Sequence, residues 1–164
     1  MSDVTVRAAR QDEYDVWFEE TAAEFAAEQV ASGTWTEDEA LEKAREGQRG
    51  WLPQGLATPG MLLLIGERDG TPVGRIWIGL THPRGVPDCA FLYDIEVAAE
   101  HRGRGLGRAL LRAGEAVARE HGAQALELNV FGSNATAIHL YETAGYRVTT
   151  QQMRKDLGEE SAAP

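Results

Sequence analysis

The stretch Val97-Ala98-Ala99-Glu100-His101-Arg102-Gly103-Arg104-Gly105-Leu106-Gly107-Arg108 joins two runs of different periodicity. Residues 91–97 are apolar and strand-like, whereas residues 106–121 form an amphipathic, helix-like run. A glycine-rich turn that opens a helix presents bare backbone N–H groups and the positive end of the helix dipole, and both attract phosphate. The stretch therefore predicts a strand, a phosphate-binding turn and a helix in succession.

The charge around this turn is opposite to that of the whole chain. Residues 101–112 contain four arginines and no acidic residue, although the chain has a formal net charge of −10. The overall charge argues against nucleic acid as the main partner, because a phosphate backbone needs positive charge spread over a surface. An acidic run near the N-terminus is typical of a solvated helix face, and its alternative role is to attract a cationic substrate. That run comprises Asp12, Glu13, Asp15, Glu19, Glu20, Glu24 and Glu28.

The rest of the sequence predicts one α+β domain. We expect strands at residues 4–8, 61–67, 73–80, 89–97, 125–131 and 146–157. We expect helices at residues 11–31, 36–51, 106–121 and 134–143. Asp69-Gly70 indicates an antiparallel hairpin. The strand, helix and strand between residues 89 and 131 imply a parallel pair.

The strand at residues 89–97 carries most of the candidate chemistry. Side chains alternate between the two faces of a regular strand. One predicted face holds Phe91, Tyr93, Ile95 and Val97. The opposite predicted face holds Leu92, Asp94 and Glu96.

The length of 164 residues suits one domain with a buried core, at residues 1–157, followed by a disordered tail at 158–164. The single cysteine, Cys89, excludes an internal disulfide and fits a reducing compartment. The polar start shows no signal peptide, and no apolar run has the length of a membrane span. We therefore expect a cytoplasmic protein without membrane contact.

Two common phosphate-binding motifs do not fit the glycine turn. A nucleoside-triphosphate P-loop requires Lys-Ser or Lys-Thr after its glycines, and neither pair is present here. A dinucleotide-binding turn that starts at Gly103 would need its third glycine at the position of Arg108.

A third motif fits, and it extends beyond the turn. Arg102-x-x-Gly105-x-Gly107, placed after a strand, resembles the acetyl-CoA pyrophosphate loop of the GNAT superfamily, the GCN5-related N-acetyltransferases. The run from Asn134 through Tyr141 to Gly145-Tyr146 resembles the second signature of that family. The resemblance covers about residues 4–157. It implies the GNAT fold, with flanking helices around a mixed, mostly antiparallel sheet of six to seven strands and a splayed parallel strand pair.

The resemblance also implies which residues bind acetyl-CoA, the donor of the acetyl group. It implies that Val97 supplies backbone hydrogen bonds to the pantetheine arm of acetyl-CoA. It implies that the turn holds the pyrophosphate through Arg102, Gly103, Arg104, Gly105, Leu106, Gly107 and Arg108. Asn134 and Tyr141 stand seven residues apart, two helical turns, and therefore share one helix face. On that face Asn134 would bind the pantetheine arm and Tyr141 would approach the thioester sulfur.

The implied reaction is direct attack of a primary amine on acetyl-CoA. The amine is protonated at neutral pH, so a base must first remove a proton. We assign that role to Glu96, with Asp94 in reserve, and we assign protonation of the departing thiolate to Tyr141. The alternative for Glu96 is an ion pair with Arg7, Arg75 or another basic residue. No metal ion is expected.

The sequence defines the acceptor amine less well than the donor. A substrate site lined by the acidic residues near the N-terminus would suit a cationic amine, on a small molecule or on a protein or peptide. The alternatives to an acetyltransferase are a CoA-binding sensor or structural module without turnover, and a transferase for a longer acyl-CoA. A homodimer is compatible with the resemblance.

Overall fold

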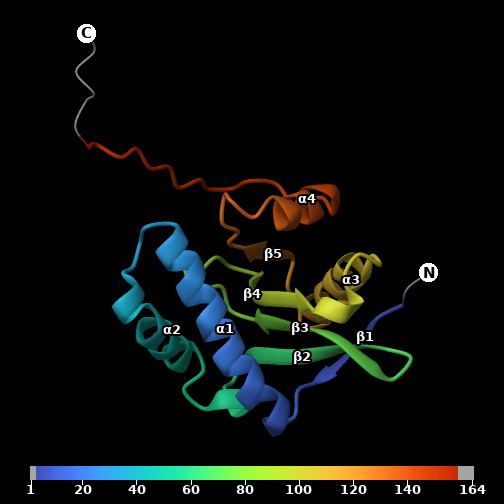
Figure 1. Cartoon of the computed structure of the whole chain (residues 1–164). Helices are drawn as coiled ribbons and strands as arrows, with labels where there is room; N and C mark the ends of the chain where they lie inside the picture. The colour runs from blue at the N-terminus through green and yellow to red at the C-terminus, as the bar shows by residue number, and fades with distance from the viewer. Residues whose placement is uncertain (1–2, 159–164) are drawn as a thin grey trace.

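Apolar side chains alternate onto both faces of the central strands, so the sheet needs helices on both sides. The computed structural model describes residues 3–158 and contains a five-stranded sheet in the order β1-β2-β3-β4-β5 (Figure 1). The strands are β1 Thr5–Ala8, β2 Met61–Arg68, β3 Thr71–Gly79, β4 Cys89–Val97 and β5 Ala125–Leu128. Neighbours from β1 to β4 are antiparallel, and β4 and β5 are parallel. This confirms the predicted α+β fold and its mixed, mostly antiparallel sheet.

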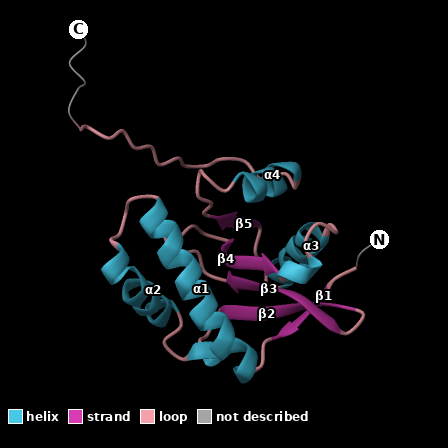
Figure 2. Cartoon of the chain, in the orientation of Figure 1, coloured by secondary structure: helices cyan, strands magenta, loops and turns pink. Residues whose placement is uncertain are grey.

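The described part of the chain also forms four α-helices (Figure 2). They are α1 Gln11–Ala31, α2 Glu37–Trp51, α3 Leu106–Glu120 and α4 Ala135–Thr143. Helices α1 and α2 pack together, whereas α3 packs on β1, β3 and β4. No helix in residues 3–158 is long and apolar enough to cross a membrane.

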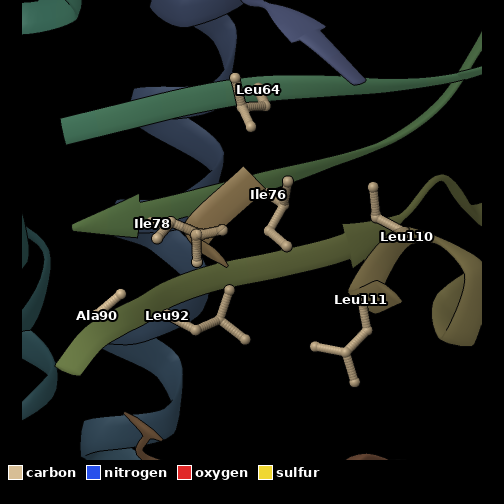
Figure 3. Packing of buried hydrophobic residues seen from close by; sticks show 8 residues of the cluster. Leu64, Ile76, Ile78, Ala90, Leu92, Leu110 and Leu111 are labelled. Atoms are coloured by element: carbon tan, nitrogen blue, oxygen red, sulfur yellow. The ribbon is translucent and has the colours of Figure 1, made fainter. Parts of the chain in front are cut away.

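Alternate residues of the strands fill separate cores. Ile76 and Ile78 of β3 pack with Leu110 and Leu111 of α3 on one face (Figure 3). Between them, Trp77 points to the other face and packs in a cluster with residues of α1 and β2. Small side chains join the two helices that cover this second face, namely Ala22, Ala26, Ala40 and Ala44. The sheet therefore separates an α3 core from a core beneath α1 and α2.

The strand count is lower than the six to seven that we predicted. Residues 146–157 are extended, but within the described part of the chain they form no strand of the sheet. Tyr146 packs against the α3 core, but the large apolar side chains after it remain outside, with Val148 71%, Met153 86% and Leu157 86% exposed. Without burial, nothing offsets the entropic cost of pairing this segment with the sheet. Of the predicted tail, residues 159–164 lie outside the described residues.

The predicted faces of β4 are wrong in its second half because the strand contains a β-bulge. Trp77 pairs with Asp94 while the next residue, Ile78, pairs with Leu92, so Tyr93 is an extra residue. An extra residue reverses the alternation that follows it. Ile95 and Val97 consequently join Leu92 on the α3 face. Asp94 and Glu96 lie instead on the α1 face.

Candidate active site

The glycine turn between β4 and α3 exposes its backbone. Gly103 and Gly105 have φ angles of 74° and 73°, in the left-handed region that favours glycine. A Cβ atom at either position would meet no atom within 4 Å, so both backbones face open space. Gly105 is the N-cap of α3, and the N–H groups of the following turn have no partner within the helix. This arrangement can bind an anion.

Arginines line a groove beside the same turn. The groove has a volume of about 420 Å³, and Arg104, Gly105, Arg108 and Arg112 contribute to its walls. Arg108 also donates a hydrogen bond from Nη2 to the Oγ1 atom of Thr143, which links α3 to α4. The side chain of Leu106 is buried in the core, so this residue can offer a ligand only its backbone.

Arg102 lies differently from the other arginines of the turn. Its Nε atom donates to the carbonyl oxygen of Val97 at 3.0 Å, and its Nη2 atom lies 2.7 Å from Oε1 of Glu96. The side chain therefore folds back over the end of β4. The carbonyl of Val97 and one oxygen of Glu96 are both engaged by it.

The parallel strands separate at this end of the sheet. The last pair between β4 and β5 is Leu92 with Leu128, immediately before the bulged residue Tyr93. Beyond it, Asp94 to Val97 pair with β3 but no longer with β5. The bulge therefore coincides with the opening of the predicted splayed pair.

Tyr141 projects from α4 next to this opening. Burial, with a smaller effect from the negative charge of Asp94, raises the pKa of Tyr141 to about 12. The phenol therefore carries its proton at neutral pH. The ring of Tyr146 packs against it with centroids 5.7 Å apart, and the Tyr146 hydroxyl donates to Glu115 of α3 at 2.9 Å. This contact fixes the end of α4 on α3.

Asn134 occupies the N-cap of α4. Its Oδ1 atom accepts a hydrogen bond from the backbone N–H of Ala137 at 3.1 Å. Within residues 3–158 the side-chain NH₂ group donates no hydrogen bond, so it can donate to a ligand.

Carboxylates converge on Arg75 at the α1 side of the opening. The side chain of Arg75 is only 10% exposed. Its Nε atom donates to Asp94 Oδ2 at 2.9 Å, and its Nη2 atom lies 2.6 Å from Glu96 Oε2 and 3.2 Å from Glu24 Oε2. Nη1 bonds Glu20. The structure thus shows the ion pair of Glu96 with Arg75 that the sequence left as an alternative, whereas Arg7 pairs with other carboxylates.

Burial, with a smaller effect from neighbouring carboxylates, raises the pKa values of several of these groups. Partial burial and then the charge of Glu96 raise the pKa of Glu24 to about 7. Burial and then the charge of Asp94 raise the pKa of Glu28 above its ordinary value. Burial also raises the pKa of Asp94, against the opposing effect of Arg75. This side of the opening therefore favours a positively charged ligand.

The sequence matches that of a known family along most of the chain. The model of the acetyltransferase (GNAT) family matches residues 12–146. The chain belongs to the GNAT family.

Relatives of this GNAT chain cover nearly its whole length. The uncharacterized N-acetyltransferase YdgE of Bacillus subtilis (strain 168) is 32% identical over 154 residues, 93% of this chain and 98% of YdgE. The crystal structure of Bacillus subtilis YycN, named as an acetyltransferase, has a TM-score of 0.89 and 31% identity over 95% of this chain and 99% of that one. A PaiA N-acetyltransferase from Thermoplasma acidophilum, solved in complex with coenzyme A, shares the fold at a TM-score of 0.64 and 17% identity, over 92% and 93% of the two chains. The chain is thus an N-acetyltransferase of the GNAT family.

The sequence named Arg75 only as a possible ion-pair partner of Glu96, and Glu24 only as one member of the acidic run. Neither was predicted as part of the candidate site, because both belong to segments far from the glycine turn and neither is part of a local motif. The one available signal was the acidic run of α1, which includes Glu24. The charge pattern predicted attraction of a cation, but it could not specify which of the acidic residues face the sheet.

A second polar cluster of the GNAT chain lies at the opposite end of β4. Ligand atoms of His82, Cys89 and Glu127 lie within 4.8 Å of one another. The backbone N–H of Arg84 donates to His82 Nδ1 at 3.0 Å, so the proton of the neutral ring is on Nε2, which lies 2.7 Å from Glu127 Oε2. A metal at Nε2 would require a proton on Nδ1, facing another N–H. The geometry favours a hydrogen-bonded pair that ties the loop after β3 to β5.

Proposed function

We propose that the protein transfers the acetyl group of acetyl-CoA to a cationic primary amine. The observation that carries this proposal is the position of the opened end of β4. It lies between an exposed anion-binding turn, the protonated hydroxyl of Tyr141 and an excess of carboxylates. These groups suit the pyrophosphate, the thioester and the amine respectively.

The donor side is proposed to work mainly through the backbone. N–H groups of residues 103–108 bind the pyrophosphate, with added charge from Arg104 and Arg108. Val97 and the NH₂ group of Asn134 bind the pantetheine arm. Since Arg102 occupies the Val97 carbonyl, its side chain has to turn away from β4, and the pyrophosphate is the natural new partner for it.

Acetyl-CoA supplies an acyl group already activated as a thioester. The residues of the chain supply orientation and proton transfer. Tyr141 retains its proton at neutral pH and can therefore donate it to the departing sulfur. The carboxylates hold the amine and accept its proton.

The acceptor is proposed to be cationic because of the charge around the opening. Glu20, Glu24, Asp94 and Glu96 all contact a single buried arginine, and Glu28 lies nearby. One arginine cannot neutralise this set, and the field of the remaining carboxylates concentrates cations. A polyamine, an aminoglycoside or a lysine side chain meets this requirement.

The test is release of free thiol from acetyl-CoA with a panel of amines. The panel contains a polyamine, an aminoglycoside, a lysine peptide and, as the matched control, the amine of an acidic amino acid. We expect turnover with the cationic members and at least a ten-fold lower kcat/KM with the acidic one, which corresponds to about 1.4 kcal/mol. The small-molecule and peptide arms separate the two acceptor classes.

Two other outcomes would replace the proposal. Tight acetyl-CoA binding without thiol release from any amine would identify a binding module. Faster turnover with a longer acyl-CoA than with acetyl-CoA would identify a different acyltransferase.

The proposal includes a homodimer. Residues 147–158 are extended, and their apolar side chains Val148 and Met153 are exposed. Arg154 holds this segment across the end of α1, with Nη1 3.2 Å from the carbonyl oxygens of Ser32 and Gly33. If a second copy of the chain covers these side chains, each one that becomes fully buried would stabilise the dimer by about 1.5–3 kcal/mol.

Light scattering after size exclusion tests this part. We expect a dimer that becomes a monomer in the double variant Val148→Glu, Met153→Glu. A monomeric wild-type protein at all concentrations would contradict it.

A further inference from the structure

A proton acceptor for the amine needs an oxygen that is accessible and not already engaged by a cation. Glu96, the base that the sequence suggested, does not meet this requirement. Its Oε1 atom lies 2.7 Å from Arg102 Nη2 and its Oε2 atom lies 2.6 Å from Arg75 Nη2. Both oxygens are engaged by guanidinium groups. When Arg102 moves to a bound pyrophosphate, Oε1 of Glu96 is released, but its Oε2 atom stays 2.6 Å from Arg75, a closer contact than the 3.2 Å between Arg75 and Glu24.

Asp94 and Glu20 are also poor acceptors. Oδ2 of Asp94 accepts hydrogen bonds from Trp17 Nε1 at 2.8 Å and from Arg75 Nε at 2.9 Å, and its side chain is only 14% exposed. Glu20 is 55% exposed, but its Oε2 atom makes the shortest of the four contacts with Arg75, at Nη1. Asp94 and Glu20 are therefore held by Arg75 more closely than Glu24 is.

Glu24 differs from all three. It contacts Arg75 only through Oε2, at 3.2 Å, the longest of the four contacts. Within the described residues its Oε1 atom accepts no hydrogen bond from an N–H group, and its side chain is 50% exposed. Helix α1 thus presents an accessible carboxylate oxygen at the side of the opening where an amine would enter.

Charges from three elements lie around Glu24. Arg75 of β3 and Asp94 and Glu96 of β4 act on it directly, and Glu20 and Glu28 stand four residues before and after it on α1. The carboxyl groups of Glu24 and Glu96 are close enough to share a hydrogen bond. Partial burial and the negative neighbours favour the protonated form of Glu24, and together they raise its pKa to about 7. A base with such a pKa exchanges protons readily at neutral pH.

We propose that Glu24, rather than Glu96, takes the proton from the acceptor ammonium. The proposal rests on the acetyl transfer proposed above. The ammonium gives one proton to Glu24 and the neutral amine attacks the acetyl carbonyl, so the N–C bond forms and the C–S bond breaks. The sulfur takes the proton of Tyr141, and the second proton that leaves the nitrogen restores the Tyr141 hydroxyl. Glu24 then returns its proton to solvent.

The first test compares the pH dependence of kcat/KM in the wild type, Glu24→Gln, Glu96→Gln and Glu20→Gln. Glu20→Gln is the matched control, because it removes a charge and an Arg75 contact from the same helix. The wild type should lose activity below an apparent pKa near 7. Glu24→Gln should lose that acidic limb together with about 100-fold in kcat/KM. Glu20→Gln and Glu96→Gln should retain the limb.

A second test needs no turnover. Carbon NMR of the glutamate carboxyl groups in the free protein should show one resonance that titrates near pH 7. The resonance should be absent in Glu24→Gln and present in Glu20→Gln. A Glu24 resonance that titrates near its ordinary value would overturn the proposal.

Failure of this proposal differs from failure of the proposed function. If the wild type transfers no acetyl group to any amine, the transferase function fails and the role of Glu24 fails with it. If the wild type is active and Glu24→Gln keeps the acidic limb, only the role of Glu24 is wrong. If Glu96→Gln alone removes the limb, the base is Glu96.

Discussion

The two sides of the opened strand pair are built in different ways. The proposed donor side is a run of consecutive residues, 103–108, whose backbone N–H groups are oriented by two left-handed glycines. The proposed acceptor side consists of side chains from α1, β3 and β4 that meet around Arg75. The donor side therefore depends on local conformation and can be recognised in the sequence. The acceptor side depends on the tertiary fold, so changes there should alter stability and pH dependence as well as activity.

The largest expected effect is at Arg75. Arg75→Met leaves Asp94 buried without its cation, and breaking a buried ion pair in this way costs about 3–5 kcal/mol of unfolding free energy. The loss should shrink at low pH, because the uncompensated carboxyls then take up protons. Urea unfolding at neutral and acidic pH measures both effects.

Arg7→Met serves as the control for Arg75→Met. Arg7 also contacts two carboxylates, Glu13 and Glu67, but its side chain is more exposed. Arg7→Met should therefore lower the unfolding free energy by only about 1 kcal/mol. Equal losses in the two variants would remove the contrast between a buried acceptor side and an ordinary surface ion pair.

The next effect separates chemistry from binding. Tyr141→Phe removes the proton donor and keeps the ring, so kcat should fall about 100-fold. The Kd of acetyl-CoA, measured by calorimetry, should change less than about two-fold, or about 0.4 kcal/mol. The control is Tyr146→Phe, which removes a hydroxyl from the adjacent ring but leaves Tyr141 intact. Unchanged turnover in Tyr141→Phe would rule out its role as the acid.

A smaller effect is expected on the donor side. Gly105→Ala places a Cβ at a φ angle of 73°, which costs about 1–2 kcal/mol. If the turn relaxes to avoid this cost, its N–H groups move, and the Kd of acetyl-CoA should rise about 5- to 30-fold. Gly122→Ala is the matched control, since Gly122 lies at the other end of α3 with a φ angle of 92° and open space for a Cβ. It should lower stability but not affinity, and an equal loss of affinity in both variants would contradict a local donor site.

The smallest effect distinguishes two carboxylates of α1. The folded protein raises the pKa of Glu24 to about 7 from 4.5, so it binds this proton more tightly than the unfolded chain, and Glu24 lowers stability as pH rises from 5 to 7. Glu24→Gln should remove up to about 1 kcal/mol of that decrease, because solvent screens a half-exposed group. Glu13 should act in the opposite direction. Its hydrogen bond with Arg7 lowers its pKa to about 2, so its contribution is present above pH 4.5 and is lost as pH falls toward 2. Thermal unfolding from pH 3 to 8 measures both slopes, and parallel slopes for Glu24→Gln and Glu13→Gln would contradict this distinction.

Local signals predicted most of the fold. The glycine turn placed the start of α3 at Leu106, and the periodicity of residues 11–31 gave the bounds of α1. Asp69-Gly70 marked the hairpin between β2 and β3. These features depend on a few neighbouring residues, which is why one sequence suffices to find them.

Other features could not be predicted because they depend on distant contacts. The pattern at residues 146–157 suits a strand, but pairing requires a partner edge that the pattern does not specify. Likewise, Glu96 stands at a plausible position for a base, yet only the fold shows that Arg75 and Arg102 engage both of its oxygens. Glu24 was one acidic residue among several on its helix until packing against the sheet distinguished it.

The extra residue in β4 is an insertion that the strand absorbs without turning its neighbours over. Leu92 pairs with Ile78 and Asp94 pairs with the adjacent Trp77, so deleting Tyr93 would join two residues that already face opposite sides of the sheet. Asp94 and Glu96 would stay on the α1 face, whereas the ring that stacks on Trp77 and the irregularity at which β4 leaves β5 would both be lost. We infer that the bulge sets the width of the gap between β4 and β5 rather than the direction of the acidic side chains.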